Sequence, residues 1–175
     1  MPPNTIFTIG HSTRKIDQLI AILESYDIPI LADVRSYPRS RTNPQFNTDT
    51  IPLELNRHKI DYVWLERLGG RRKGFGQKSK NTSWKNRGFR NYADYMEGSS
   101  FLEGFNELKT LTLKGHVAIM CAELLYWQCH RLMISDFLKS KGYSVIHIFD
   151  KKHSSVHKFT ECARLVDGEL TYHPT

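Results

Sequence analysis

The chain has 175 residues, of which 39% are hydrophobic and 25% are charged. This length predicts a single domain over residues 1–175, and the composition excludes a disordered tail and a fibrous repeat. The longest apolar run, residues 117–122, is far shorter than the roughly 20 residues of a membrane span, so no membrane partner is expected. Three cysteines without a secretory signal favour a cytoplasmic protein with reduced thiols.

The positive charge is concentrated in one segment. The whole chain carries a net charge of +7, and residues 66–90 hold nine lysines and arginines against one acidic residue. Glycines recur there, and Trp84 and Phe89 lie among the cations. We therefore expect a basic loop inserted at about residues 66–90, which binds phosphates and stacks an aromatic ring on a base. The alternative is a solvated, mobile loop with incidental charge.

Apolar spacing predicts alternating strands and helices. Strands are expected at residues 5–9, 28–34, 60–65, 116–122 and 143–149, with a short one near 170–172. Helices are expected at 16–23, at 52–58 after a cap at Thr50, and at 128–141. Two more helical stretches are expected after the basic loop, and the second of them ends at Gly115. The second of the two stretches begins at Ser100 with a capping-box pattern. Because several strands are apolar on both faces, we predict an α/β fold, a single-domain three-layer sandwich with a mostly parallel central sheet.

Polar residues follow three of the predicted strands. Ligands of an open parallel sheet bind beyond the carboxyl ends of its strands, so we expect these residues to surround one cleft. The first strand leads to His11 and Ser12, the second to Asp33, Arg35, Arg39, Arg41, Asn43 and Phe46, and the fourth to Cys121, Glu123, Cys129, His130 and Arg131.

Arg131 is the strongest local indication of an anion site. A cation in the first turn of a helix is electrostatically misplaced, because cations stabilise the opposite end. A bound anion would offset this charge and would also accept hydrogen bonds from the free N–H groups of the first turn.

Most of these residues also have a purely structural interpretation. His11 can hydrogen-bond a turn, and Asp33 can pair with Arg35. Cys121 can be a small buried apolar residue unless a low pKa makes it reactive. No metal is expected, because the adjacent Cys129 and His130 would point in different directions on a helix. No cofactor is expected either, since the chain has no phosphate-binding glycine motif.

Several of these motifs together resemble the DUF488 family. They occupy residues 8–12, 33–41, 43–47, 68–70, 92–96, 120–123 and 129–131. The resemblance implies a compact α/β domain with a polar cluster at these positions, and it implies no particular reaction. A looser similarity relates residues 33–35 and 120–131 to rhodanese-like domains, in which a cysteine loop lies between a strand and a helix.

The first functional hypothesis is an enzyme that acts on a nucleic acid or a nucleotide-type, phosphate-bearing substrate. Metal-free hydrolysis, such as cleavage of an N-glycosidic bond, would use Asp33 or Glu123 to activate water and His11 or His130 as proton donor. The expected binding residues are Ser12, Arg35, Arg39, Arg41, Asn43, Phe46, Arg71, Arg72, Lys73, Tyr95, Cys129 and Arg131.

Two further hypotheses remain open. One is a cysteine-dependent transfer of a sulfur or phosphoryl group, with Cys121 as nucleophile, Arg131 in the anion hole and Cys129 as a resolving thiol. The other is a nucleic-acid-binding module without catalysis.

Overall fold

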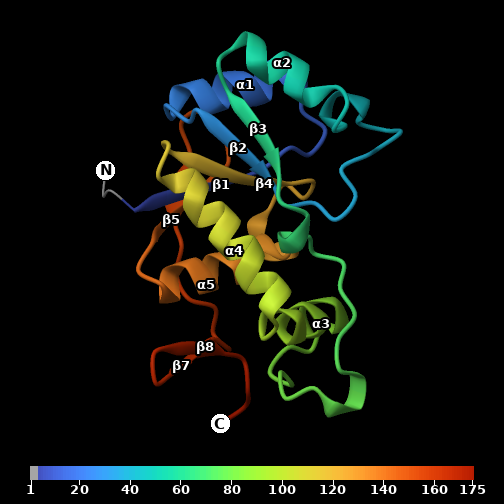
Figure 1. Cartoon of the computed structure of the whole chain (residues 1–175), viewed down its shortest axis with the longest axis vertical. Coiled ribbons are helices and arrows are strands. Elements are labelled where there is room, and N and C mark those ends of the chain that lie inside the picture. Colours follow the sequence, from blue (N-terminus) through green and yellow to red (C-terminus); the bar gives the residue numbers. More distant parts are fainter. Residues whose placement is uncertain (1–3) are drawn as a thin grey trace.

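A six-stranded sheet lies at the centre of the computed structural model, which describes residues 4–175 (Figure 1). Its order is β3-β2-β4-β1-β5-β6, and all neighbours are parallel except β5 and β6. The strands are β1 (Thr5–Gly10), β2 (Ile30–Asp33), β3 (Asp61–Trp64), β4 (Val117–Cys121), β5 (Ser144–Ile148) and β6 (Ser154–Val156).

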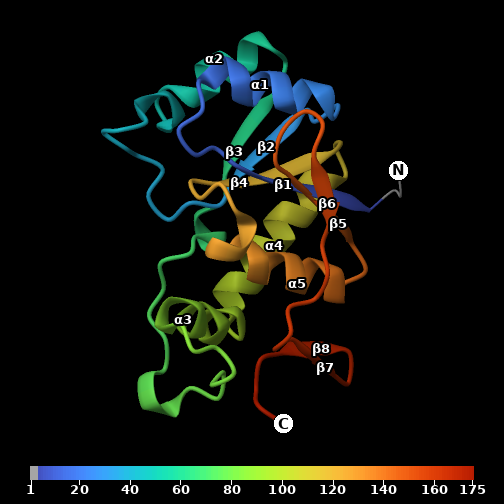
Figure 2. The ribbon, with the colours of Figure 1, turned by 180° about the vertical axis from the view of Figure 1, so that it is seen from behind.

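Helices cover both faces of this sheet (Figures 1 and 2). One face packs against α1 (Ile16–Ser25) and α2 (Ile51–Arg57), and the other against α4 (Ser99–Thr112) and α5 (Arg131–Ser140). Helix α3 (Arg87–Met96) lies farther from the sheet, beside α4. The predicted α/β three-layer sandwich is therefore confirmed.

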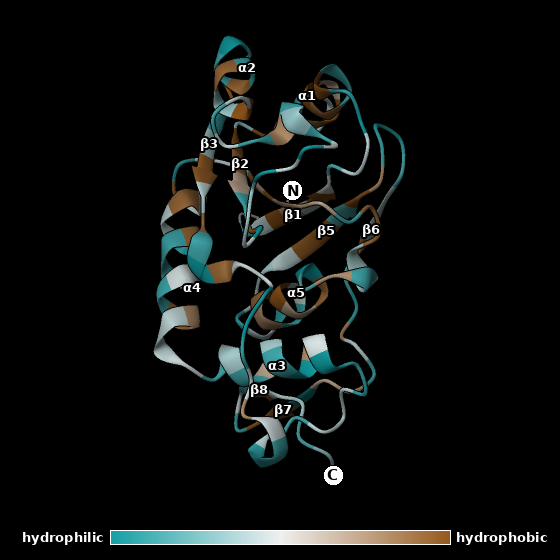
Figure 3. Ribbon diagram, turned by 90° about the vertical axis from the view of Figure 1, so that its right-hand side faces the viewer, coloured by the Kyte–Doolittle hydropathy of each residue, from teal (hydrophilic) through white to brown (hydrophobic). Residues whose placement is uncertain are grey.

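The two apolar cores follow from the alternation of side chains along each strand. In β1, Ile6 belongs to the core beneath α4 and α5, whereas Phe7 and Ile9 belong to the core beneath α1 and α2. Apolar residues are concentrated in the strands and on the inner sides of the helices, while hydrophilic residues predominate around α3 (Figure 3). None of the helices in residues 4–175 has the length and apolar character needed to cross a membrane.

The parallel register brings the carboxyl ends of three strands to one edge. Gly10 lies opposite Cys121, and Asp33 lies opposite Met120. The chain segments that leave β1, β2 and β4 therefore start close together, as the sequence predicts.

Some element boundaries differ from the prediction. The capping box at Ser100 is wrong, because α4 begins after Gly98 and has no side-chain cap. The helix expected from residue 128 begins only at Arg131, after a 3₁₀ turn at Tyr126–Gln128. A hairpin of β7 (Arg164–Val166) and β8 (Glu169–Thr171) near the carboxyl terminus turns at Asp167 and Gly168, both with positive φ. This Asp-Gly pair is a hairpin signal that the sequence prediction did not use.

The basic segment 66–90 is fixed to α3 by a buried carboxylate. Asp94 is 1% exposed and accepts hydrogen bonds from the backbone of Phe75, the hydroxyl of Ser79 and the amide of Asn81. Trp84 packs edge-on against Phe89 and Tyr172. The segment is thus organised by specific contacts, and the ring of Trp84 is occupied within the protein.

Candidate functional site

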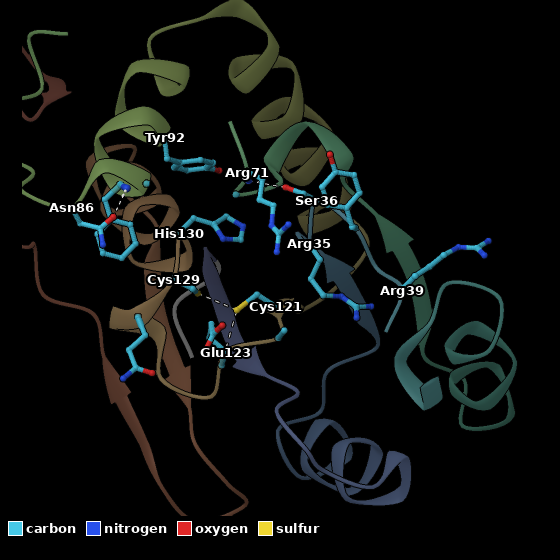
Figure 4. Close-up of a pocket in the computed structure, with 16 residues that line it drawn as sticks. Arg35, Ser36, Arg39, Arg71, Asn86, Tyr92, Cys121, Glu123, Cys129 and His130 are labelled. Atoms are coloured by element: carbon cyan, nitrogen blue, oxygen red, sulfur yellow. Dashed lines mark hydrogen bonds between the residues drawn. The ribbon is translucent and has the colours of Figure 1, made fainter. Parts of the chain in front are cut away.

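A pocket of about 630 Å³ lies at the carboxyl edge of the sheet (Figure 4). This volume is typical of a site for a small molecule. Its lining comes from the segments that follow β2, β3 and β4, from the first half of α3, and from the residues before α5: Arg35, Ser36, Tyr37, Arg39, Gly70, Arg71, Asn86, Gly88, Phe89, Tyr92, Cys121, Ala122, Glu123, Gln128, Cys129 and His130.

Two buried thiols lie in this lining. Cys121 ends β4, and Cys129 precedes α5 by two residues. Their Sγ atoms are 3.0 Å apart, and the side chains are 3% and 7% exposed. The backbone N–H of Arg131, at the start of α5, donates to Cys129 Sγ over 3.4 Å. Cys129 therefore lies where a helix N-terminus favours a thiolate.

The guanidinium of Arg131 contacts both sulfurs. Its Nε donates to Cys121 Sγ at 2.9 Å and to Cys129 Sγ at 3.3 Å. Its remaining hydrogen bonds go to the Thr8 hydroxyl and to the carbonyls of Glu123 and Leu124. The side chain is only 1% exposed. The two sulfurs thus occupy the place beside Arg131 in which we expected an external anion. The hydrogen bonds of the guanidinium go to groups of the protein itself.

Proton affinities in this cluster are strongly perturbed. Burial raises the pKa of Cys129, but the hydrogen bond from Cys121, the adjacent His130 and the charge of Arg131 outweigh it and hold that pKa well below its usual value. Burial and the contact with Cys129 raise the pKa of Cys121. Although burial disfavours its charge, the sulfurs raise the pKa of Arg131. These opposite shifts favour ionisation of Cys129 over ionisation of Cys121.

His130 and Glu123 complete this side of the pocket. His130 donates from Nε2 to the carbonyl of Val34 over 2.7 Å, and its ring packs against Tyr92. A Cβ atom at Gly70 would lie 2.5 Å from His130 Nδ1, so only glycine fits there. Glu123 is exposed and lies beside Cys121 in Figure 4.

Asp33 and His11 do not reach the pocket. Asp33 is fully buried, and its carboxylate pairs with Arg35 at 2.6 Å and accepts from the Tyr62 hydroxyl at 2.5 Å. Arg35 also donates to His11 Nε2 and to the carbonyl of Phe46. The structural interpretation of Asp33 as the ion-pair partner of Arg35 is therefore what the structure shows.

His11 is held neutral in the same buried cluster. Its Nδ1 donates to the carbonyl of Ser12, and its ring stacks on Phe46 with centroids 4.2 Å apart. Burial and the charge of Arg35 lower the pKa of His11 to about 4. Phe46 is fully buried, so its ring is closed to the base that we expected it to contact.

Two cations at the rim are free to meet a ligand. Arg39 and Arg71 line the pocket, and no described residue forms a hydrogen bond or ion pair with either guanidinium, although that of Arg71 lies 5.7 Å from the centre of the Tyr37 ring. Figure 4 shows Arg71 directed between His130 and Arg35, and Arg39 directed outward. An adjoining cavity of about 460 Å³ is lined by Arg71, Arg72 and Lys73.

The other predicted binding residues lie elsewhere. Arg72 donates to the carbonyls of Gly69 and Glu66 and lies over the ring of Tyr95, whose hydroxyl bonds to Arg67. Outside the pocket lining are Ser12, Arg41, Asn43 and Tyr95.

Several pocket residues were not among the predicted catalytic and binding residues, although Tyr37 and Tyr92 lie within the motifs that resemble the family. Tyr37 is 72% exposed at the rim and lies between Arg35 and Arg39 in the sequence, which was the available signal. Tyr92 and Gln128 reach the pocket only through the packing of α3 and of the loop before α5. No periodicity in the sequence indicates that packing.

A family model, described as a domain of unknown function, DUF488, matches residues 15–138. No curated protein and no solved structure matches the chain. The similarity to rhodanese-like domains is not shown by these comparisons.

Proposed function

The chain belongs to the DUF488 family, and from the geometry of its pocket we propose that it is a cysteine-dependent transferase for a phosphate-bearing substrate of the nucleotide or nucleic-acid type. The observation that carries this proposal is the pair of thiols, Cys121 and Cys129, which line a pocket with a cationic rim and are both contacted by the buried Arg131. A low-pKa thiolate that borders an open cavity is a ready nucleophile.

Sulfur transfer suits this cluster better than phosphoryl transfer. Phosphoryl transfer needs free donors around the transferred group, whereas the Arg131 guanidinium bonds to Thr8, to two carbonyls and to the sulfurs. Sulfur transfer needs only a thiolate and an anionic sulfur donor. The Cys129 thiolate attacks the outer sulfur of the donor, and a new S–S bond forms as the donor's S–S bond breaks.

The electron pair of the broken bond leaves with the remainder of the donor, for example as sulfite when the donor is thiosulfate. A nucleophilic atom of the acceptor then bonds to the outer sulfur of the persulfide. The electrons of the persulfide bond return to Cys129, which restores the thiolate.

The rim supplies contacts for the acceptor. Arg39 and Arg71 are placed to neutralise phosphate, and the exposed ring of Tyr37, which lies beside Arg71, offers an aromatic face for a base. The adjoining cavity, which Arg72 and Lys73 line, shares Arg71 and Gly88 with the main pocket. The positive surface therefore continues beyond the main pocket, where further phosphates of a longer substrate would bind.

Persulfide formation with thiosulfate tests the proposal. We expect the wild type to gain one sulfur atom on Cys129 by peptide mass spectrometry and to release sulfite in a single turnover. Cys129→Ser should lose both signals, and Glu123→Gln, a change in the same pocket that leaves the thiols, should keep them. No sulfur uptake by the wild type, or equal uptake by Cys129→Ser, would overturn the proposal.

Metal-free hydrolysis remains as a second candidate because Glu123 is exposed in the same pocket. Only one of the two expected carboxylates is available for it, since Asp33 is buried in its ion pair. Release of free base from a nucleotide, lost in Glu123→Gln and retained in Cys129→Ser, would favour this function.

A further inference from the structure

A continuous chain of buried hydrogen bonds runs from Arg131 away from the pocket. Arg131 Nη1 is 3.2 Å from Thr8 Oγ1, and Thr8 Oγ1 is 2.8 Å from His147 Nδ1. His147 Nε2 is 2.9 Å from His157 Nδ1, and His157 Nε2 is 2.9 Å from the carboxylate of Asp136. All five side chains are at most 1% exposed.

Separate elements bring these residues together. Thr8 and His147 are direct neighbours in the register of β1 and β5, and Asp136 lies on α5, one and a half turns beyond Arg131. The ring of Tyr126 stacks on His147 with centroids 3.4 Å apart. At the far end, Asp136 also accepts hydrogen bonds from the hydroxyls of Thr160 and Tyr172.

When both histidine rings are neutral, the two ends of the chain fix the direction of every hydrogen bond. A guanidinium only donates and a carboxylate only accepts. His157 must therefore donate from Nε2 to Asp136 and accept at Nδ1 from His147. His147 then accepts at Nδ1 from the Thr8 hydroxyl, whose oxygen lone pair is left to face Arg131. One tautomer of each neutral histidine satisfies the whole chain.

We propose that Thr8, His147, His157 and Asp136 form a positioning network, which holds the guanidinium of Arg131 against the thiols and thereby sets their reactivity. The inference rests on the proposed thiol chemistry. Burial and the neighbouring His157 and Arg131 lower the pKa of His147 to about 2, so its ring stays neutral and keeps the hydrogen-bond direction. None of these four residues lines the pocket, and each acts through Arg131.

The network is one of several influences on the sulfurs. The charged and titratable groups around them are Arg131 and His130 from the start of α5, Glu123 from the loop after β4, Tyr92 from α3, and Arg35, Arg39 and Arg71 from the opposite side of the pocket. A test must change the network and leave these groups in place.

Thr8→Val removes the hydroxyl that links Arg131 to His147 and nearly preserves the side-chain volume. In a Cys162→Ser background, we measure the pH dependence of Cys129 alkylation by iodoacetamide, assigned by peptide mass spectrometry. We expect the apparent thiol pKa to rise by about one unit, which lowers the alkylation rate about tenfold at pH values below the wild-type thiol pKa and has little effect well above it. Thr8→Ser should restore the wild-type profile. Ser135→Ala, which removes another fully buried hydroxyl, should leave it unchanged.

The outcomes separate the two proposals. A wild-type thiol that titrates in the ordinary range contradicts the proposed function. A low wild-type thiol pKa that Thr8→Val leaves unchanged contradicts the positioning network alone. If Thr8→Val does not fold, nitrogen chemical shifts of the wild-type histidine rings decide, since the network requires neutral His147 and His157 protonated at Nε2. A charged ring or an Nδ1–H tautomer in either would overturn the network.

Discussion

The Sγ atoms of Cys121 and Cys129 are in contact at 3.0 Å, although the two residues are eight positions apart in the chain. A disulfide needs about 2.0 Å, so a small movement of either side chain closes the bond. We therefore expect mild oxidation with diamide to join these two cysteines and to leave Cys162 reduced. Thiol titration and peptide mapping measure this result. A disulfide that includes Cys162 would contradict the observed arrangement.

Buried neutral histidines predict a loss of stability in weak acid. The pKa of His11 is lowered to about 4 and that of His147 to about 2, both mainly by burial. Between about pH 6.5 and pH 4 the unfolded chain binds protons that the folded chain does not. Each histidine therefore lowers the free energy of unfolding by about 1.4 kcal/mol per pH unit of acidification.

Urea unfolding at several pH values between 6.5 and 4 measures this slope. His11→Gln should reduce the slope relative to the wild type by the contribution of one histidine, because glutamine does not titrate. Identical slopes in the two proteins would show that His11 has the same pKa in the folded and unfolded chains, which contradicts the lowered pKa.

The ion pair of Asp33 and Arg35 predicts a structural phenotype for Asp33→Asn. Removing one partner leaves a buried guanidinium charge uncompensated, which costs about 3 kcal/mol. Tyr62→Phe removes only a hydroxyl from the same carboxylate and should cost about 1 kcal/mol. Denaturant unfolding compares the variants. If Asp33→Asn abolishes activity at unchanged stability, Asp33 has a chemical role that its burial does not indicate.

Gly10 allows the end of β1 to approach the loop after β4. A Cβ atom there would lie 1.9 Å from the carbonyl oxygen of Glu123, which accepts a hydrogen bond from Arg131. We expect Gly10→Ala to displace this loop, to destabilise the fold by about 2 kcal/mol and to slow alkylation of Cys129. Gly88→Ala, where the nearest atom would lie at 3.2 Å, is the matched control for stability. Equal effects of the two changes would contradict the close approach.

The rim cations predict charge-dependent binding of a polyanion. Arg71→Glu should weaken binding of a fluorescent single-stranded oligonucleotide and flatten its dependence on salt, because a phosphate contact is lost. Fluorescence anisotropy at several salt concentrations measures both effects. Lys109→Glu makes the same charge change on α4, outside the pocket, and should have a smaller effect. Equal losses would indicate a diffuse electrostatic effect without a site.

Much of the fold is predictable because apolar spacing reports which residues are buried. The four parallel connections and the convergence of strand ends follow from it. Apolar spacing does not indicate on which side of the sheet each polar residue lies. Asp33 shares a face with Leu31, toward α1 and α2, whereas Cys121 shares the opposite face with Ile119. Both faces of these strands are apolar, so the sequence does not indicate which helices cover the face that carries each polar residue.

The basic segment 66–90 is a second case in which the sequence does not indicate the role of each residue. Its charge is evident in the sequence, but Arg72 is bound to the carbonyls of its own loop and Arg67 pairs with Glu103 and Glu107. Only contacts between distant parts of the chain determine which cations remain free for a ligand.

The contact between Thr8 and Arg131 joins residues 123 positions apart. Contacts of such long sequence separation form late in folding. This one requires that β1 and β4 have paired and that α5 has packed against them. We therefore expect the cysteines of a newly synthesised or partly folded chain to have ordinary reactivity. Cys129 becomes a reactive nucleophile only when the tertiary structure is complete. The rate of alkylation of Cys129 can thus be used to follow the last stage of folding.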